Sequence, residues 1–167
     1  MTSAAAQPAD NNDIDESFLD EAVELAVRNV LDGGGPFGAV LVQDEVVVAR
    51  GVNRVTQNLD PSAHAEVLAI REACQVRGDF QLRGMTLYAS CEPCPMCLAT
   101  ALWARVDRVL YAGDRHDAAV GGFDDLAFYD LFATSRDQWE TPVVQLRTQD
   151  PAAPFEAWLR STSRVDY

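Results

Sequence analysis

The sequence contains no lysine. Its 13 basic residues are therefore all arginine, and they stand against 26 aspartates and glutamates, which gives a formal net charge of -13 over 167 residues. A surface with so strong an acidic excess repels phosphate backbones. We therefore expect no nucleic acid among the partners of this protein.

Long hydrophobic runs are missing as well. No stretch approaches the roughly 20 apolar residues of a membrane span, and the opening "MTSAAAQPADNN" lacks the basic start and apolar run of a secretory signal. These absences predict a soluble, cytoplasmic protein that has no membrane partner, with a disordered tail at residues 1–13. Because 48% of the residues are hydrophobic and no linker or repeat interrupts the chain, we expect residues 14–167 to form a single domain.

The apolar pattern predicts alternating strands and helices. Apolar residues with a helical period indicate a helix over residues 14–32, which "GGGP" ends. The runs "GAVLVQ" and "VVVARG" flank Asp44 and Glu45 as in a β-hairpin. Further strands are predicted at "MTLYAS", "DRVLYAG" and "PVVQLR", and further helices at "AHAEVLAIREACQVRG", "MCLATALWAR" and "PFEAWLRS". Five strands alternating with helices predict an α/β fold with a mixed sheet between two helical layers.

Three of the four cysteines lie within "CEPCPMC". Such crowding in a cytosolic chain indicates metal binding or catalysis more often than disulfides. Proline is favoured in the first turn of a helix, so Pro95 is expected as the first helical residue and Cys94 as its cap. Cys97 then lies one turn further on the same face, and the helix dipole favours both thiolates. Cys94 and Cys97 are the predicted pair of metal ligands.

A third ligand must come from one of only two histidines. We favour His64, at the start of a helix, over His116, which is expected in a polar loop. Adding Cys91 would complete a structural four-ligand zinc site, a common use of such clusters. However, Glu66 follows His64 by two residues, and His-x-Glu with Pro-Cys-x-x-Cys is the signature of zinc deaminases, whose glutamate is the general acid and base. We therefore predict one zinc per subunit with a bound water or hydroxide.

Taken together, these motifs make the chain resemble the bacterial guanine deaminases of the cytidine deaminase-like superfamily, from about residue 18 to the end. The resemblance rests on the segments "GGPFGAV", "DPSAHAEVLAIREAC", "LYASCEPCPMCLATALWAR" and "HDAAVGGFDD" and on the terminal Tyr167. It implies a three-layer α/β/α fold around a mixed five-stranded sheet. It also implies a homodimer whose C-terminal segments are exchanged, so that each active site is closed by the partner.

The resemblance further implies roles for individual residues. His64, Cys94 and Cys97 correspond to the zinc ligands, and Glu66 corresponds to the proton shuttle. Phe37 and Asn53 correspond to residues that stack on the purine and hydrogen-bond it, and Asp125 corresponds to a carboxylate near the departing amine. Tyr167 corresponds to a group from the exchanged tail, and the backbone of Ala65 and Cys94 corresponds to the pocket wall. Without the resemblance, Asn53 and Asp125 would be interpreted as caps and Phe37 as a core residue.

The implied reaction is the zinc-dependent hydrolysis of a small nucleobase, guanine, to xanthine and ammonia. The same chemistry on guanosine, cytosine or an aminotriazine such as ammeline stays open, because the metal motifs do not distinguish these rings. Deamination of tRNA adenosine shares the motifs too, but the net charge counts against it. A different class is a binding module with a purely structural zinc site, which would leave Glu66 without a task.

Overall fold

In the computed structural model, residues 12–166 are described, and they form twelve helices and strands. In chain order the elements are α1 (Asn12–Leu31), β1 (Gly38–Gln43), β2 (Val46–Val52), α2 (Val55–Asn58), α3 (Ala65–Arg77), β3 (Met85–Cys91), α4 (Pro95–Trp103), β4 (Arg108–Gly113), α5 (Arg115–Val120), α6 (Asp125–Ala133), the short 3-10 helix η1 (Arg136–Gln138) and α7 (Ala153–Arg160). The chain divides into two compact units, and the boundary lies between Ala133 and Thr134.

The first unit is built around a mixed sheet with the strand order β2-β1-β3-β4. Strand β1 pairs antiparallel with both β2 and β3, whereas β3 and β4 are parallel. The β1–β2 hairpin turns at Asp44 and Glu45, and both residues have positive φ angles of 49° and 62°. This left-handed conformation at both central residues matches the twist of the strands. The predicted hairpin and mixed sheet are therefore confirmed.

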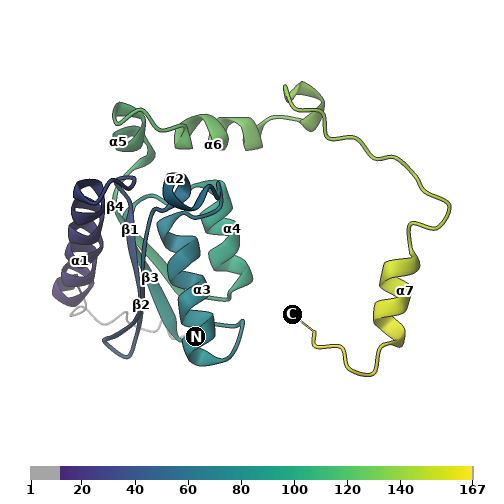
Figure 1. Cartoon of the computed structure of the whole chain (residues 1–167), viewed down its shortest axis with the longest axis horizontal. Coiled ribbons are helices and arrows are strands. Elements are labelled where there is room, and N and C mark those ends of the chain that lie inside the picture. Colours follow the sequence, from purple (N-terminus) through teal and green to yellow (C-terminus); the bar gives the residue numbers. More distant parts are fainter. Residues whose placement is uncertain (1–11, 167) are drawn as a thin grey trace, which may run out of the picture. The chain divides into compact units, whose positions relative to one another are not determined.

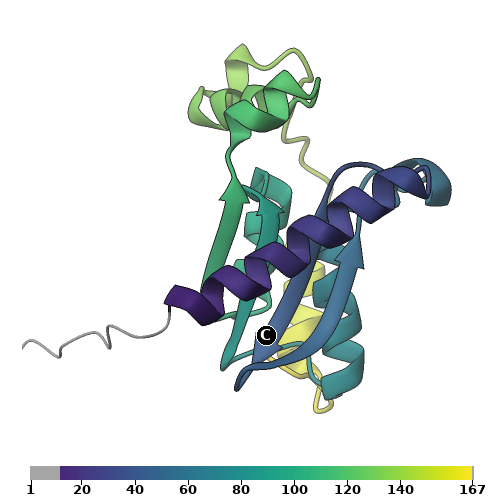
Figure 2. The ribbon, with the colours of Figure 1, turned by 90° about the vertical axis from the view of Figure 1, so that its left-hand side faces the viewer.

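Helices cover both faces of this sheet, α1 on one side and α3 with α4 on the other (Figure 1). Figure 2 shows α1 running diagonally across the strands. Two glycines allow close packing: a Cβ atom on Gly38 would lie 2.4 Å from the carbonyl oxygen of Ala22, and one on Gly51 would lie 2.0 Å from that of Ala65. Any side chain there would force α1 or α3 away from the sheet. The predicted α/β/α layering is thus present.

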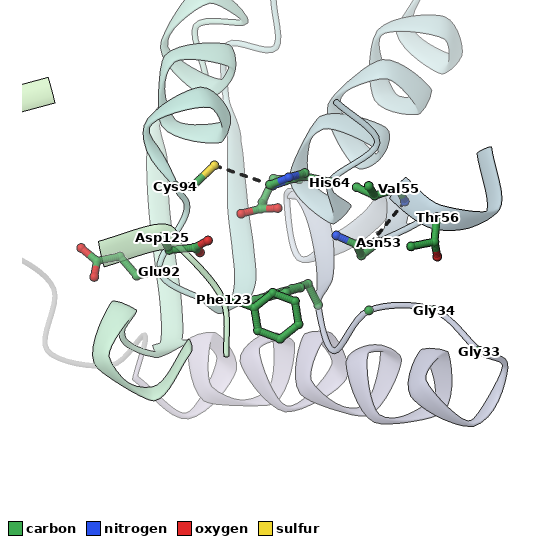
Figure 3. A pocket seen from close by; sticks show the side chains of 13 residues that line it. Gly33, Gly34, Asn53, Val55, Thr56, His64, Glu92, Cys94, Phe123 and Asp125 are labelled. Atoms are coloured by element: carbon green, nitrogen blue, oxygen red, sulfur yellow. Dashed lines mark hydrogen bonds between the residues drawn. The ribbon is translucent and has the colours of Figure 1, made fainter. Parts of the chain in front are cut away.

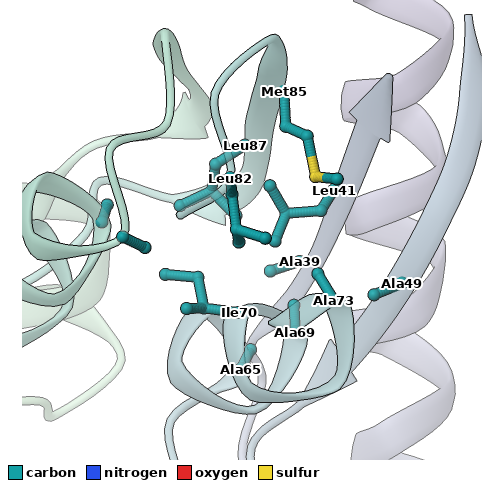
Figure 4. Packing of buried hydrophobic residues seen from close by; sticks show 12 residues of the cluster. Ala39, Leu41, Ala49, Ala65, Ala69, Ile70, Ala73, Leu82, Met85 and Leu87 are labelled. Carbon is teal, nitrogen blue, oxygen red and sulfur yellow. The ribbon is translucent and has the colours of Figure 1, made fainter. Parts of the chain in front are cut away.

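The main core fills the space between the sheet and helices α3 and α4 (Figure 4). Helix α3 contributes a stripe of alanines, Ala65, Ala69 and Ala73, spaced four residues apart on one face. Larger side chains from the strands, including Leu41 and Leu87, fill the space against them. Because this packing holds α3 firmly, it fixes the position of the residues at the N-terminus of the helix.

On the other face, a buried polar contact ties α1 to the sheet. The hydroxyl of Tyr88 on β3 donates a hydrogen bond to Asp15 on α1. Arg108 on β4 donates another to the same carboxylate, with 2.7 Å between its Nη2 and Asp15 Oδ2. Burial raises the pKa of Asp15, but the hydrogen bonds from Arg108 and Tyr88 and the charge of Arg108 outweigh it, so the pKa lies below its usual value. Three elements are therefore locked together by one carboxylate.

The second unit, from residue 134 onward, holds η1 and α7 but no strand among its described residues. The prediction of a fifth strand at "PVVQLR" is wrong for this structure, because residues 142–147 adopt no strand conformation and the sheet has four strands. A strand requires a neighbouring backbone with which to exchange hydrogen bonds, and residues 134–166 contain no other strand. Within residues 12–166, no helix combines the length and hydropathy needed to cross a bilayer.

Candidate active site

The site lies where α3 and α4 begin. His64 is the N-cap of α3 and Cys94 is the N-cap of α4, with Pro95 as the first helical residue. Cys97 follows one turn into α4 and is fully buried. The predicted proline register is therefore confirmed. Both caps have extended backbone conformations, and no side-chain hydrogen bond caps either helix, so these side chains are available to a ligand.

Three donor atoms converge at this point. The Sγ atoms of Cys94 and Cys97 are 3.6 Å apart, and they lie 3.7 and 3.5 Å from Nδ1 of His64. Donor atoms about a tetrahedral zinc ion, with bonds of about 2.0–2.3 Å, are expected to be about 3.5–3.8 Å apart. Among the described residues, this is the one group of three or more potential ligands that could hold a metal. Donor set and spacing both fit zinc.

The ligand group contains a thiol whose pKa is lowered, which suits a bound cation. The hydrogen bond between the Cys94 and Cys97 side chains, together with nearby His64, lowers the pKa of Cys94 to about 4. The same hydrogen bond, with burial, raises the pKa of Cys97. Hydrogen bonding with Cys94 raises the pKa of His64. At least one thiolate is therefore present at neutral pH, as zinc ligation requires.

Glu66 lies beside the ligand group, in the first turn of α3, and its side chain is 7% exposed. Burial raises its pKa to about 7. Its position is set by the same turn of helix that presents His64, since both belong to "HAE". A carboxyl group with a pKa near neutrality can both accept and return a proton, which is the property expected of a general acid and base.

A cavity of about 420 Å³ opens onto these residues. It is lined by Gly33, Gly34, Gly35, Phe37, Asn53, Val55, Thr56, His64, Glu66, Glu92, Cys94, Phe123 and Asp125 (Figure 3). The cavity thus brings together segments from the α1–β1 loop, α2, the helix starts and the segment after α5. Its volume suits a small heterocycle.

Asn53 faces this cavity from the end of β2. Its Oδ1 accepts a hydrogen bond of 3.3 Å from the backbone amide of Val55, and Figure 3 shows its Nδ2 end directed into the cavity. The backbone carbonyl of Asn53 accepts a hydrogen bond from the buried side chain of Asn29 on α1, which also donates to the carbonyl of Gly35. Two pocket-lining segments are therefore joined through Asn29.

An aromatic pair forms another wall. Phe37 lies edge-to-face with Phe123, with ring centroids 4.8 Å apart. Asp125, two residues after Phe123, begins α6 and points its carboxylate toward the metal ligands in Figure 3. Burial raises the pKa of Asp125. The structure therefore brings the predicted residues Phe37 and Asp125 to one cavity with Asn53.

Some predicted residues lie elsewhere. Ala65 is buried between His64 and Glu66 and does not line the cavity with its side chain, so a backbone contact with substrate stays a prediction. Tyr167 lies outside the described residues. His116 is exposed in α5 rather than in a loop.

Cys91 stays apart from the ligand group. It is half-buried, and its thiol donates to the carbonyl oxygen of Asp114 at 3.4 Å. Burial raises the pKa of Cys91 to about 11. A four-ligand structural site with Cys91 is therefore not formed among the described residues.

Several lining residues were not predicted from the sequence. Phe123 belongs to "GGFDD", which was interpreted as a turn and as part of the resemblance to guanine deaminases, but the phenylalanine itself was given no role. Glu92 lies between Cys91 and Cys94 and was likewise given no role. Thr56 and the glycines before Pro36 looked like ordinary loop residues. Only Glu92 carried a usable signal, because a carboxylate two residues before a metal ligand is close to the site by chain connectivity alone.

The chain is similar to known deaminases in sequence and in structure. The cytidine and deoxycytidylate deaminase zinc-binding region matches residues 12–113. Guanine deaminase from Bacillus subtilis is 46% identical over 91% of this chain and 98% of its own length, and its X-ray structure gives a TM-score of 0.88. The structure of a guanine deaminase from Nitrosomonas europaea gives a TM-score of 0.63 at 26% identity, over 74% of this chain and 77% of that one.

A more partial relative is a tRNA-specific adenosine deaminase from Bacillus subtilis, which is 40% identical over 58% of this chain and 60% of its own length. The layered fold and the histidine and cysteine ligands beside a buried glutamate define a zinc-dependent aminohydrolase. The chain belongs to the family of the cytidine and deoxycytidylate deaminase zinc-binding region. The resemblance to guanine deaminases and the zinc cofactor expected from the sequence are confirmed.

Proposed function

We propose that this protein deaminates guanine by hydrolysis and releases xanthine and ammonia. The observation that carries this proposal is the similarity to Bacillus subtilis guanine deaminase, which extends over 98% of that protein. The similarity thus includes the chain beyond the metal motifs, whereas the similarity to the tRNA-specific enzyme spans 60% of that relative. Shared metal motifs alone would not separate these substrates.

The metal ligands and Glu66 have complementary tasks. His64, Cys94 and Cys97 would hold a zinc ion, which when bound would lower the pKa of water to about 7 and so supply a nucleophile at neutral pH. Glu66 accepts a proton from the attacking water and returns it to the ring nitrogen beside the carbon that bears the amine. Glu66 then takes the remaining proton of the hydroxyl group added to the ring and passes it to the amine, so that the carbon–nitrogen bond breaks, the added oxygen becomes a carbonyl and ammonia leaves. The pKa of Glu66 near 7 suits both directions of transfer.

The remaining cavity residues would hold the base. The Nδ2 group of Asn53 is directed into the cavity and can donate to a ring acceptor. Phe37, packed against Phe123, offers an apolar face for stacking. Asp125 faces the metal ligands from the opposite wall, where it would hold the departing amine, and Tyr167 would close the pocket from the partner subunit.

We also infer a homodimer in which the second unit of each chain is exchanged. Two separate observations support this. In the first unit, an apolar cavity of about 690 Å³ between α4 and α6 leaves Leu102 and Phe128 largely exposed. In the second unit, Phe155 and Leu159 on α7 are 71% and 68% exposed. Apolar surfaces of this kind are typically buried in an interface.

The substrate is tested by measuring ammonia release from the zinc-loaded protein with guanine, guanosine, cytosine, adenine and ammeline in separate reactions. We expect rapid release from guanine and little from the other four. Release from guanosine or ammeline at a comparable rate would contradict guanine specificity while retaining the deaminase chemistry. No release from any of the five, with one zinc per chain present, would contradict the proposal.

A further inference from the structure

Arg115, the first residue of α5, forms a salt bridge with Glu92, which immediately follows β3. Its Nε lies 2.8 Å from Oε2 of Glu92, its backbone amide donates to the same oxygen at 3.2 Å, and its Nη2 donates to Oε1. The pairing is bidentate, and the two side chains are only 27% and 13% exposed. Paired carboxylate and guanidinium groups of this geometry hold one another in a fixed orientation.

The planar face of the same guanidinium group stacks on the ring of Tyr129 in α6, with 3.4 Å between Cζ of Arg115 and the ring centroid. The Tyr129 hydroxyl in turn donates a hydrogen bond of 2.6 Å to the backbone carbonyl of Pro93. Glu92 and Pro93 are neighbours in the chain, so the contacts form a closed ring. We refer to Glu92, Pro93, Arg115 and Tyr129 as the Arg115 clasp.

The clasp joins the two walls of the active site. Pro93 immediately precedes Cys94, and Tyr129 lies one helical turn after Asp125 on α6. Helix α6 has no buried residue, so hydrophobic burial does little to fix it. In Figure 3 the Glu92 carboxylate is directed away from that of Asp125, although both residues line the cavity. Arg115 therefore holds a second negative charge out of the pocket.

We propose that Arg115 is a positioning residue for the deamination: through Glu92 and Tyr129 it fixes the Asp125 carboxylate opposite the metal ligands. Arg115 itself touches neither the cavity nor the metal ligands. The inference rests on the function proposed above. The proposal also predicts that a positive charge at position 115 does not by itself maintain the rate of deamination. Lysine lacks both the bidentate pair of donors and the planar face that stacks on Tyr129.

The first test compares Arg115→Lys and Arg115→Met with the wild type. Because a displacement of about 1 Å in a catalytic group can cost about 100-fold in rate, we expect kcat for guanine to fall by about 10- to 100-fold in both variants. KM should change little, because Phe37 and Asn53 lie on other elements. The matched control is Arg50→Met, which removes the Arg50 to Glu21 ion pair of 2.6 Å between β2 and α1.

A double variant separates action through Glu92 from a general loss of stability. Glu92→Gln with Arg115→Met should lose no more activity than Arg115→Met alone, because the partners share one interaction. Additive losses in the double variant would contradict the clasp. Thermal unfolding of every variant is recorded alongside, and a fall in kcat that simply follows the melting temperature, in Arg50→Met as well, would also overturn the proposal.

Hydrogen exchange provides a readout that does not depend on turnover. In Arg115→Met we expect faster exchange of the amides in residues 125–129 and 96–98, with no change in α3, and no such pattern in Arg50→Met. Unchanged exchange in α6 would overturn the positioning role. Absence of ammonia release from guanine in the wild type would instead contradict the proposed function, while the exchange comparison would still decide whether Arg115 fixes α6.

Discussion

Asn29 on α1 donates a hydrogen bond of 2.9 Å to the backbone carbonyl of Asn53, a proposed substrate-binding residue 24 positions further along the chain. The same Nδ2 group donates to the carbonyl of Gly35 at 2.8 Å, and the side chain is only 1% exposed. One buried amide therefore holds two edges of the cavity at a fixed separation. Its Oδ1 has no hydrogen-bond partner among residues 12–166, which indicates that the donor function of the amide outweighs that cost.

Replacing this amide tests whether it supports the pocket. Asn29→Ala leaves two carbonyl groups without their donor, so we expect the free energy of unfolding to fall by about 2–3 kcal/mol. KM for guanine should rise because Asn53 is no longer held. Urea unfolding and steady-state kinetics measure the two effects, with the exposed Gln75→Ala on α3 as control. A variant with wild-type stability and KM would show that Asn29 does not support the pocket.

Glu66→Gln tests the proton transfer. The amide is nearly isosteric but cannot accept a proton, so turnover should fall by about 100- to 10,000-fold. Zinc content should stay at one per chain, because Glu66 is not among the three ligands. Metal analysis and ammonia release on the same preparation give both answers. Substantial turnover in this variant would contradict the assigned role.

Cys91 distinguishes a catalytic from a structural zinc site. Since its thiol contacts the Asp114 carbonyl rather than the ligand group, Cys91→Ser should keep zinc and activity. Cys97→Ser, in contrast, removes a fully buried ligand and should lose the metal. Zinc content after dialysis, compared between the two serine variants, is the measurement. Equal loss of zinc from both would favour a four-ligand structural site.

The buried contact of Asp15 predicts how stability depends on pH. Because the pKa of Asp15 is lower in the folded chain than its ordinary value of about 3.9, the ionised group stabilises the fold above that value. This contribution is lost as the pH falls through the lower folded pKa. Asp15→Asn should therefore reduce stability at pH 6 and flatten its decline in acid. Urea unfolding from pH 6 to pH 3, with Asp20→Asn on the same helix as control, checks the slope.

Local signals in the sequence predicted much of the fold and the metal ligands. The proline at the start of α4 predicted the register of Cys94 and Cys97 correctly. Gly78, in the left-handed conformation, ends α3 as the sequence pattern predicted. Such signals act over one turn of helix and can be interpreted without a structure.

Contacts between distant segments could not be predicted in this way. Phe123 meets Phe37, and Arg115 meets Glu92, only because α5 and α6 follow β4 and return over the end of the sheet. The predicted fifth strand failed for a related reason. Residues 142–147 have the composition of a strand, but a strand exists only where another backbone pairs with it.

Exchange of the second unit between subunits can be tested by complementation. If Tyr167 of one chain closes the site of its partner, Glu66→Gln and Tyr167→Ala are each inactive alone, yet a mixed dimer has one site with both groups intact. Random pairing in co-expressed chains then gives about a quarter of wild-type activity, because half of the dimers are mixed and half of their sites are intact. Without exchange, every site in the mixed dimer lacks one of the two groups. Ammonia release from the co-expressed pair, compared with the sum of the separately purified variants, decides between the two arrangements.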